Sequence, residues 1–595
     1  MIAFLRWLRT IFLGAVNGML KLALALFMIL LVLVIVAAIH GDGLPDNMVL
    51  TMDLRTPIRD SQARDPFAFG ARPPSVMDIV LALDHAGRDS RVKGVLLRVG
   101  SADMPVAQAE EIGAALKRFR ATGKFAIADA PGFLGNGLGD YLTAASTGEI
   151  WMQPNSPFGA SGAGSGALFL RGLFDKIDAV PQIVKRSDYK SAADMYMEKD
   201  YTAADREQTT AFLQSWVDSA TTAAAGDRHL DPKAVAADFA ASPQFTNDAK
   251  KDGLIDKIGY DDDARNAALA RAGDGAKTIT LHKYIRATES AGGYGGGTRI
   301  ALIEGSGEIV DGTAHAGLGG DSNVIAADDM VAAIRAAARD SRVKAIVIRI
   351  DSPGGSVTAS DQILNAVRKA QASGKPVVVS MGMLAASGGY YIATSANRIV
   401  AEPATLTGSI GVLTGKVAIG KSLALLGVGA DQIGVGKNAL FDSALDPYTP
   451  DQLANLNRQA DAIYADFTAK VAKGRKLPLA DVQQIAKGRV WTAADAKPKG
   501  LVDELGGFWT AVDAARKLAG IGAGETVSFK LYPQPRGLFG TVDSVFSGTA
   551  AGVRTLEGLQ SMMEMPVARS LLHAAGDVPH GGVELRATGL PRDDQ

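Results

Sequence analysis

Apolar and polar positions follow the same order in two stretches of the chain. Each stretch has an apolar helix pattern that leads to the sequence Arg-Asp-Ser-Arg-Val-Lys, at residues 88–93 and again at 339–344, and an apolar strand follows directly. A second helix pattern comes next, over 107–120 in the first stretch and 360–372 in the second. A Gly-Lys pair and another apolar strand then follow in both. Strands that alternate with helices at this spacing predict an α/β fold with parallel strands, and the repeated order predicts an internal duplication.

The boundaries of the repeats follow from pattern and composition. Residues 48–54 and 299–303 have the alternation of a β-strand and begin the two repeats. The glycine-rich residues 291–298 form a flexible linker by composition. We therefore expect an N-terminal repeat over 45–290 and a C-terminal repeat over 299–530.

The chain changes character beyond the second repeat. Residues 531–595 are expected to form a partly disordered C-terminal extension. Within it, residues 556–572 have the pattern of a helix with a Met-rich face, whereas the polar end, 579–595, has the composition of a disordered tail.

An unbroken apolar run occupies residues 22–39. As a helix it would span roughly 27 Å at about 1.5 Å per residue, close to the bilayer core of about 30 Å. Basic residues precede the run and acidic residues follow it, so residues 1–44 are predicted to be a cytoplasmic N-terminus with a single transmembrane anchor. The alternative is a cleaved signal peptide, for which Val36-Ala37-Ala38 offers a poor cleavage site. The length of the run favours the retained anchor.

The charge and the amino-acid composition exclude several classes of function. A net charge of −1 provides no basic surface for nucleic acid, so no nucleic-acid partner is expected. The chain has no cysteine, which excludes disulfides, zinc-thiolate sites and a cysteine nucleophile.

The two repeats differ where the first buried strand ends. The second repeat continues with Asp-Ser-Pro-Gly-Gly at 351–355, whereas the aligned residues 99–105 lack the paired glycines. Paired glycines between a strand and a helix allow backbone amides to turn toward a ligand. An oxyanion hole that includes Gly354 is therefore a hypothesis for the second repeat only, and a plain turn is the alternative.

Ser387 is a second difference between the repeats. It lies in Ala-Ala-Ser-Gly-Gly-Tyr-Tyr, and its counterpart in the first repeat is Asn136 or Gly137, neither of which is a nucleophile. A serine among small residues at the start of a helix is exposed to a substrate, and the helix N-terminus favours developing negative charge. A helix N-cap without a catalytic role is the alternative.

At a third position it is the first repeat that carries a candidate catalytic residue, and the second repeat that lacks it. When Gln182-Ile183 is aligned with Gln432-Ile433, Lys190 falls opposite Leu440. One repeat thus carries the serine and the glycines, and the other carries a lysine. A solvated surface lysine is the alternative, and Lys437 is the nearest rival in the second repeat.

These residue types indicate nucleophilic catalysis. A serine hydroxyl needs a base to become a nucleophile, and none of the seven histidines falls in these motifs. A lysine can act as the base if burial lowers its pKa, as in Ser-Lys variants of the catalytic triad. Backbone amides of Gly354 and Gly388 could then hold the oxyanion. No cofactor and no metal are expected.

Together with Thr-Gly-Ser-Ile-Gly at 407–411, these motifs resemble the long, duplicated form of the signal peptide peptidase A family, also called protease IV, the Ser-Lys peptidases of family S49. The resemblance covers the chain from the anchor to about residue 530. It implies a crotonase-like (Clp-protease-like) domain in each repeat, Ser387 as nucleophile, Lys190 as general base and Ser409 as the residue that positions the lysine. Ser409 is also the second candidate nucleophile.

The resemblance also implies a biological setting. Hydrophobic remnant signal peptides would be the substrates, the lipid bilayer would be contacted through 22–39, and the protein would be a homo-oligomer, a tetramer. The expected location is the bacterial inner membrane, with the catalytic body on the periplasmic side. One departure is that Lys190 is followed by Ser191-Ala192, where the family more often has an acidic-proline pair a few residues on. Acyl-CoA hydratases or isomerases of the same fold, and a non-catalytic membrane scaffold, are the alternative functions.

Overall fold

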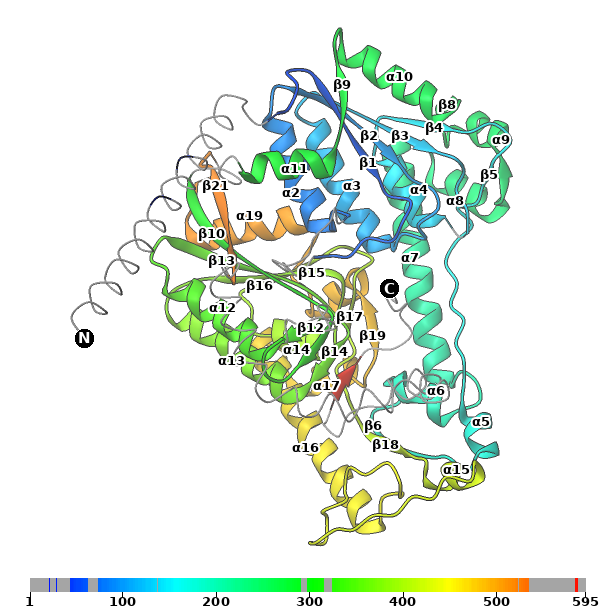
Figure 1. Ribbon diagram of the computed structural model, residues 1–595, viewed down its shortest axis with the longest axis vertical. Helices are drawn as coiled ribbons and strands as arrows, with labels where there is room; N and C mark the ends of the chain where they lie inside the picture. The colour runs from blue at the N-terminus through cyan, green and yellow to red at the C-terminus, as the bar shows by residue number, and fades with distance from the viewer. Residues whose placement is uncertain are drawn as a thin grey trace, which may run out of the picture.

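A computed structural model describes residues 21, 28, 43–61, 73–135, 137–290, 297–314, 324–522, 524–533 and 584–586 (Figure 1). The predicted membrane helix over 22–39 lies, apart from Met28, outside the described residues. The same is true of most of the linker and of the helix expected over 556–572. None of the helices within these described ranges combines the length and the apolar character that crossing a membrane requires.

The first repeat is built around a 6-stranded parallel sheet in the order β8-β4-β3-β2-β1-β9. The strands are β1 (Met48–Asp53), β2 (Val92–Arg98), β3 (Phe125–Ala130), β4 (Glu149–Met152), β8 (Lys257–Ile258) and β9 (Lys277–Thr280). The helices are α2 (Val76–Arg88), α3 (Val106–Arg120), α4 (Leu138–Ala145), α5 (Arg171–Lys176), α6 (Asp194–Met197), α7 (Ala203–Arg228), α8 (Pro232–Ala241), α9 (Thr246–Lys251), α10 (Asp261–Ala272) and α11 (Leu281–Ser290). The short strands β5 (Pro157–Phe158) and β7 (Gln244–Phe245) form a separate pair.

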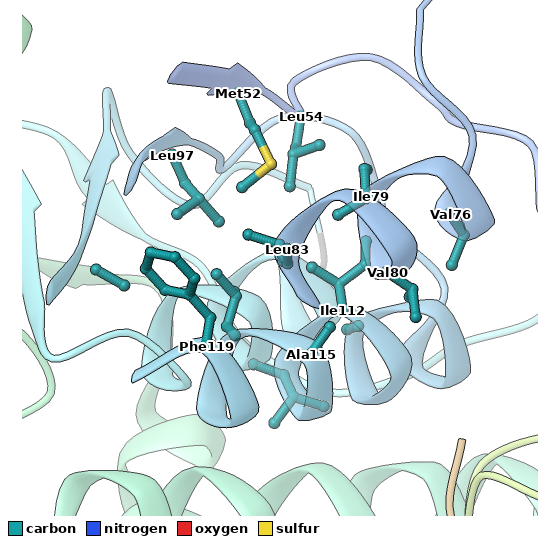
Figure 2. Packing of buried hydrophobic residues seen from close by; sticks show 14 of the residues in the cluster. Met52, Leu54, Val76, Ile79, Val80, Leu83, Leu97, Ile112, Ala115 and Phe119 are labelled. Carbon is teal, nitrogen blue, oxygen red and sulfur yellow. The ribbon is translucent and has the colours of Figure 1, made fainter. Parts of the chain in front are cut away.

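Helices cover both faces of this sheet. Figure 2 shows Met52 and Leu97 packed together with Leu83 of α2 and Phe119 of α3. On the opposite face, Val49 belongs to a second cluster that includes residues of α10. The strand predicted over residues 48–54 is thus confirmed as β1. One face is buried throughout, whereas the other is buried at Val49, half-buried at Thr51 and exposed at Asp53.

The second repeat is built around an 8-stranded sheet, in which β19-β17-β15-β13-β10-β21 follow one another. In addition, β16 pairs with β15, and β20 pairs with β16. Its strands are β10 (Thr298–Ser306), β13 (Val343–Ser352), β15 (Val377–Ala386), β16 (Arg398–Ala401), β17 (Leu406–Gly408), β19 (Val490–Thr492), β20 (Glu504–Leu505) and β21 (Val527–Tyr532). Its helices are α12 (Ala327–Arg339), α13 (Val357–Ala372), α14 (Gly388–Ala393), α15 (Gly420–Leu425), α16 (Pro450–Arg475), α17 (Leu479–Ile485), α18 (Ala493–Ala496) and α19 (Phe508–Ala519).

The repeated Arg-Asp-Ser-Arg-Val-Lys motif forms the same turn twice. In each repeat the Asp side chain accepts a hydrogen bond from the amide of the second Arg, at 3.0 Å. The lysine of the following Gly-Lys pair then donates to the carbonyl oxygen of that Asp, Lys124 to Asp89 at 2.6 Å and Lys375 to Asp340. The motif recurs because these side chains close the link between a helix and the next strand.

The correspondence continues into the later part of each repeat. Tyr141 donates to the carbonyl oxygen of Leu254 at 3.0 Å, and Tyr390 donates to that of Leu501 at the same distance. The helices α7 and α16 each have 26 residues and follow at matching places. The duplication predicted from the sequence is therefore visible in the hydrogen bonds as well as in the order of elements.

The two repeats share one hydrophobic cluster. It contains the residues shown in Figure 2 together with Leu302 and Val347 of the second sheet and Phe508 and Val512 of α19. Figure 1 shows α19 between the second sheet and the helices α2 and α3. The repeats therefore bury apolar surface against each other through α19.

Arg349 adds a buried charge network at this junction. Its guanidinium group lies 2.6 Å from a carboxylate oxygen of Asp60 and 2.7 Å from one of Glu111, both in the first repeat, and donates to Ser380 Oγ at 2.9 Å. The three charged side chains are at most 2% exposed. The neighbouring carboxylates hold the pKa of Arg349 well above its ordinary value despite its burial. This arginine ties the strand that leads to Gly354 to the other repeat.

A third sheet connects the repeats. It has the order β12-β11-β14-β22-β18-β6. Its strands are β6 (Val180–Arg186), β11 (Glu308–Val310), β12 (Val324–Ala326), β14 (Gly354–Ser356), β18 (Val412–Ala418) and β22 (Glu584–Arg586). The expectation that 579–595 is disordered is wrong at 584–586, because the main chain there pairs with β14 and β18.

Candidate active site

Strand pairing between the repeats brings the candidate lysine to the candidate serines. β6 of the first repeat runs antiparallel to β18 of the second, and Arg186 at the end of β6 pairs with Val412 at the start of β18. Lys190 follows shortly after Arg186, and Ser409 shortly precedes Val412. Because the strands are antiparallel, both residues emerge at the same end of the pair.

The amine of Lys190 lies among three serine oxygens. Its Nζ atom is 2.8 Å from Ser387 Oγ, 2.9 Å from Ser409 Oγ and 3.1 Å from the Ser409 carbonyl oxygen. These three residues, which the sequence singled out from different motifs, thus meet at one point. The second repeat supplies both serines and the first repeat supplies the lysine.

Burial sets the protonation state of Lys190. Lys190 is 1% exposed, and Ser387 and Ser409 are buried beside it, so the expectation that Ser387 is exposed is wrong. Burial lowers the pKa of the Lys190 amine well below that of an ordinary lysine, because a charged amine loses its hydration there. A neutral amine this close to a hydroxyl can accept its proton. The surface-lysine alternative is therefore wrong for Lys190.

Ser387 stands at the N-cap position of α14 but does not act as a capping side chain. Its hydroxyl makes no capping hydrogen bond, while its amide donates to the carbonyl oxygen of Gly408 at 2.8 Å. Its φ of 56° is rare for a residue with a side chain, and the surrounding pairing holds it there. Gly137, one of the two counterparts that the alignment left open, occupies the N-cap position of α4 in the first repeat. The hydroxyl of Ser387 is thus left to face Lys190.

The candidate oxyanion glycines lie next to Ser387. A side chain on Gly388 would come within 3.1 Å of Gly354 Cα and of the Gly355 amide nitrogen, so the two segments touch here. The Gly354 amide itself donates to Ser352 Oγ at 3.1 Å. The role of Gly354 and Gly388 in holding an oxyanion remains a prediction.

Glycines also make room for Lys190. A Cβ atom on Gly488, whose φ is 76°, would lie 2.6 Å from Lys190 Cβ, and one on Gly411 would lie 3.2 Å from its Cδ. The loop from the second repeat can therefore close over the lysine and exclude water from it.

Comparison with known proteins identifies the family. Residues 135–273 and 369–522 match the model of "Peptidase family S49", and residues 312–406 match that of "Clp protease". The chain is 32% identical over 524 residues to "Serine protease SPPA, chloroplastic" of Arabidopsis thaliana, covering 86% of this chain and 75% of that protein. It is 32% identical over 543 residues to "Protease 4" of Salmonella typhi, covering 87% and 83%, and 31% identical over 464 residues to "Protease 4" of Haemophilus influenzae, covering 75% and 73%. The chain belongs to peptidase family S49.

As a member of family S49, the protein is a serine protease with a Clp-protease-like α/β fold. This confirms the resemblance and the Clp-protease-like α/β part of the fold class expected from the sequence, whereas the transmembrane helix that belonged to that expectation lies almost entirely outside the described residues. The acyl-CoA enzyme and the non-catalytic scaffold are therefore set aside. Within the part of the chain that the structure describes, no group of His, Asp and Glu side chains is arranged to hold a metal ion.

Gln208 is a residue of this S49 peptidase that sequence reasoning missed. Its amide nitrogen donates to the Tyr189 carbonyl at 3.0 Å and to Ser191 Oγ at 2.9 Å, on both sides of Lys190. Its oxygen accepts from the amide of Val490 in β19 at 3.1 Å. Gln208 thus fixes the lysine loop against the second repeat. A glutamine within a long polar helix gave no signal of this role, because its partners come from distant parts of the chain.

The rival lysine of the second repeat lies elsewhere. Lys437 is 76% exposed and pairs with Asp451 at 2.9 Å. Leu440, aligned with Lys190, lies on the surface in the same segment. In this S49 peptidase the second repeat therefore has a surface segment where the first repeat places its buried lysine.

Proposed function

We propose that this S49 peptidase is a membrane-anchored endopeptidase that cleaves hydrophobic remnant signal peptides with a Ser387–Lys190 dyad split between its repeats. The observation that carries the proposal is the 2.8 Å separation of Lys190 Nζ from Ser387 Oγ in a buried site. Burial is what keeps the lysine neutral enough to serve as a base. The resemblance in the motifs supports the substrate class, and the named relatives support the protease activity.

The reaction takes two steps at these atoms. Ser387 Oγ attacks the carbonyl carbon of the scissile peptide bond while its proton passes to Lys190 Nζ, which then gives a proton to the departing amine. An ester between Ser387 and the acyl half of the peptide results. Water, deprotonated by Lys190, hydrolyses this ester and restores both side chains. Ser409 holds the amine in line through its hydroxyl and its carbonyl oxygen.

The negative charge that develops on the substrate carbonyl oxygen needs donors. The Gly388 amide at the start of α14 is the first, because it directly follows the nucleophile. An amide of the Gly354-Gly355 segment, which touches Gly388, is the second. If the Gly354 amide is that donor, the substrate oxygen replaces Ser352 Oγ as its acceptor.

The setting of the enzyme completes the proposal. Residues 22–39 anchor it in the bacterial inner membrane, with the body on the periplasmic side, where signal peptides remain after preprotein processing. The apolar run and its flanking charges support this placement. A homotetramer is part of the proposal. Exposed apolar residues in the segment after α15, such as Ile433 at 93% and Val435 at 96%, offer surface for such contacts.

The test is hydrolysis of a fluorogenic hydrophobic peptide by detergent-purified protein. We expect wild type to be active and Lys190→Ala to be inactive. Lys437→Ala is the matched control, because it removes an exposed lysine of the second repeat and should leave activity unchanged. Equal activity of wild type and Lys190→Ala would show that the lysine of the first repeat is not the base.

A further inference from the structure

Two strands beside Ser387 have main-chain edges that face each other. β14 pairs with β11 on one side, and β18 pairs with β6 on one side. The remaining edges of both strands pair with β22. We call the gap between β14 and β18, which one strand fills, the strand slot. Without β22 these two edges would be unpaired, and unpaired strand edges bind extended peptides through main-chain hydrogen bonds.

The strand slot lies at the reacting atoms. β22 contacts α14, the helix that starts directly after Ser387. One wall of the slot is β14, whose Gly354 and Gly355 abut Gly388. The other wall is β18, which follows Ser409 and pairs with the strand that leads to Lys190. A main chain in the slot therefore passes between the candidate oxyanion amides and the dyad.

β22 pairs with β14 and β18 at the positions where an extended peptide bound at this site would pair. Residues 584–586 run antiparallel to β14, with Leu585 opposite Gly355 and Arg586 opposite Gly354. Glu584 also pairs with Leu413 of β18. Main-chain atoms at Leu585 and Arg586 are thus level with the glycines that contact the start of α14. Pairing through the main chain accepts many side chains, so this position does not require the sequence of a signal peptide.

We propose that residues 584–586 form an inhibitory strand in cis, which occupies the place of a peptide substrate and must leave before the substrate enters. This inference rests on the proposed endopeptidase function and adds its regulation. A segment tethered to the same chain has a high effective concentration at the slot. The apparent affinity for a peptide is then reduced by the fraction of molecules in which the slot is open. Substrates bind antiparallel to β14, in the same register.

The experiment measures peptide binding in the Ser387→Ala background, in which neither the probe nor the extension is cut by the dyad. Three detergent-purified proteins are compared: the full chain, a chain that ends at residue 583 and a chain that ends at residue 586. The probe is a fluorescently labelled peptide of leucine and alanine, followed by anisotropy. If the strand fills the slot in about nine molecules of ten, the chain ending at 583 binds the probe on the order of 10-fold more tightly than the full chain.

The chain ending at residue 586 is the matched control, because it keeps β22 and lacks only residues 587–595. It is expected to bind the probe like the full chain. Equal probe affinity of the full chain and the chain ending at 583 overturns the inhibitory strand, although the endopeptidase proposal survives. If none of the three proteins binds the probe, the proposed substrate class fails. Amide hydrogen exchange then tests separately whether residues 584–586 occupy the strand slot. Faster exchange at Ser356 and Leu413 in the chain ending at 583 supports the strand, and unchanged exchange overturns it.

Discussion

Ser409 provides a quantitative test of how the dyad is held. In Ser409→Ala, Lys190 loses the hydroxyl contact at 2.9 Å but keeps Ser387 Oγ at 2.8 Å and the Ser409 carbonyl at 3.1 Å. A buried hydrogen bond of this kind contributes about 0.5–1.5 kcal/mol net. At about 1.4 kcal/mol per factor of ten, kcat/KM should fall about 2- to 12-fold. By contrast, loss of a chemical group of a catalytic unit costs factors of about 10⁴–10⁶.

The assay is kcat/KM for a fluorogenic hydrophobic peptide, with Ser409→Gly beside Ser409→Ala. Ser409 has a φ of 50°, which glycine adopts without strain, so Ser409→Gly removes the same hydroxyl without a backbone penalty. Both variants should lose activity by similar factors. Complete loss in both, with Ser387→Ala still active, would move the nucleophile to Ser409. Unchanged activity in both would refute a positioning role for the hydroxyl.

The remaining predictions concern the dyad and the junction between the repeats. Ser387→Ala and Lys190→Ala should each abolish hydrolysis. The double variant should be no worse than either single variant, because the effects of removing members of a catalytic unit are not additive. Substantial activity of purified Ser387→Ala would contradict the assignment of Ser387 as the nucleophile. Since only the neutral amine accepts a proton, kcat/KM should rise with pH through the lowered pKa of Lys190, and the acid limb should begin well below the range of an ordinary lysine. A rise only near the pKa of free lysine would contradict the effect of burial. Arg349→Met leaves two buried carboxylates unpaired and should destabilise the fold by about 3–5 kcal/mol, measured by denaturant unfolding. Arg98→Met removes the arginine at the equivalent position in the first repeat, on the strand that follows the repeated motif. Arg98 is partly exposed and lies 3.4 Å from Asp129, so its loss should cost about 1 kcal/mol or less; equal costs would contradict the network.

Much of the fold was predictable because its signals are local. The helices expected over 107–120 and 360–372 match α3 and α13 closely, and the strand expected over 48–54 is β1. Apolar periodicity over a few turns determines such elements, so they can be read without knowledge of their partners. The composition of 579–595 predicted disorder, and β22 was missed because its main-chain partners are β14 and β18, far away in the sequence.

The candidate site also contains residues that the sequence revealed and a residue that it did not. The repeats could be compared residue by residue, so Ser387 and Lys190 were found as complementary differences. Their roles remain predictions. The sequence did not reveal Gln208, because its partners flank Lys190 on one side and belong to β19 on the other. A side chain that acts through distant main-chain atoms leaves no pattern in its own neighbourhood.

The sequence by itself determined that this chain is a duplicated α/β protein whose repeats have diverged at a few chemically informative positions. Only the tertiary structure decided that those positions meet. The strand that follows the repeated motif carries an arginine at the equivalent position in both repeats. This arginine is buried between two carboxylates as Arg349 and partly exposed as Arg98. Likewise, Lys190 becomes a buried amine because β6 pairs with β18 of the other repeat. The physical reason is that desolvation and hydrogen-bond partners depend on which surfaces pack together, and a local pattern of residues does not encode that pairing.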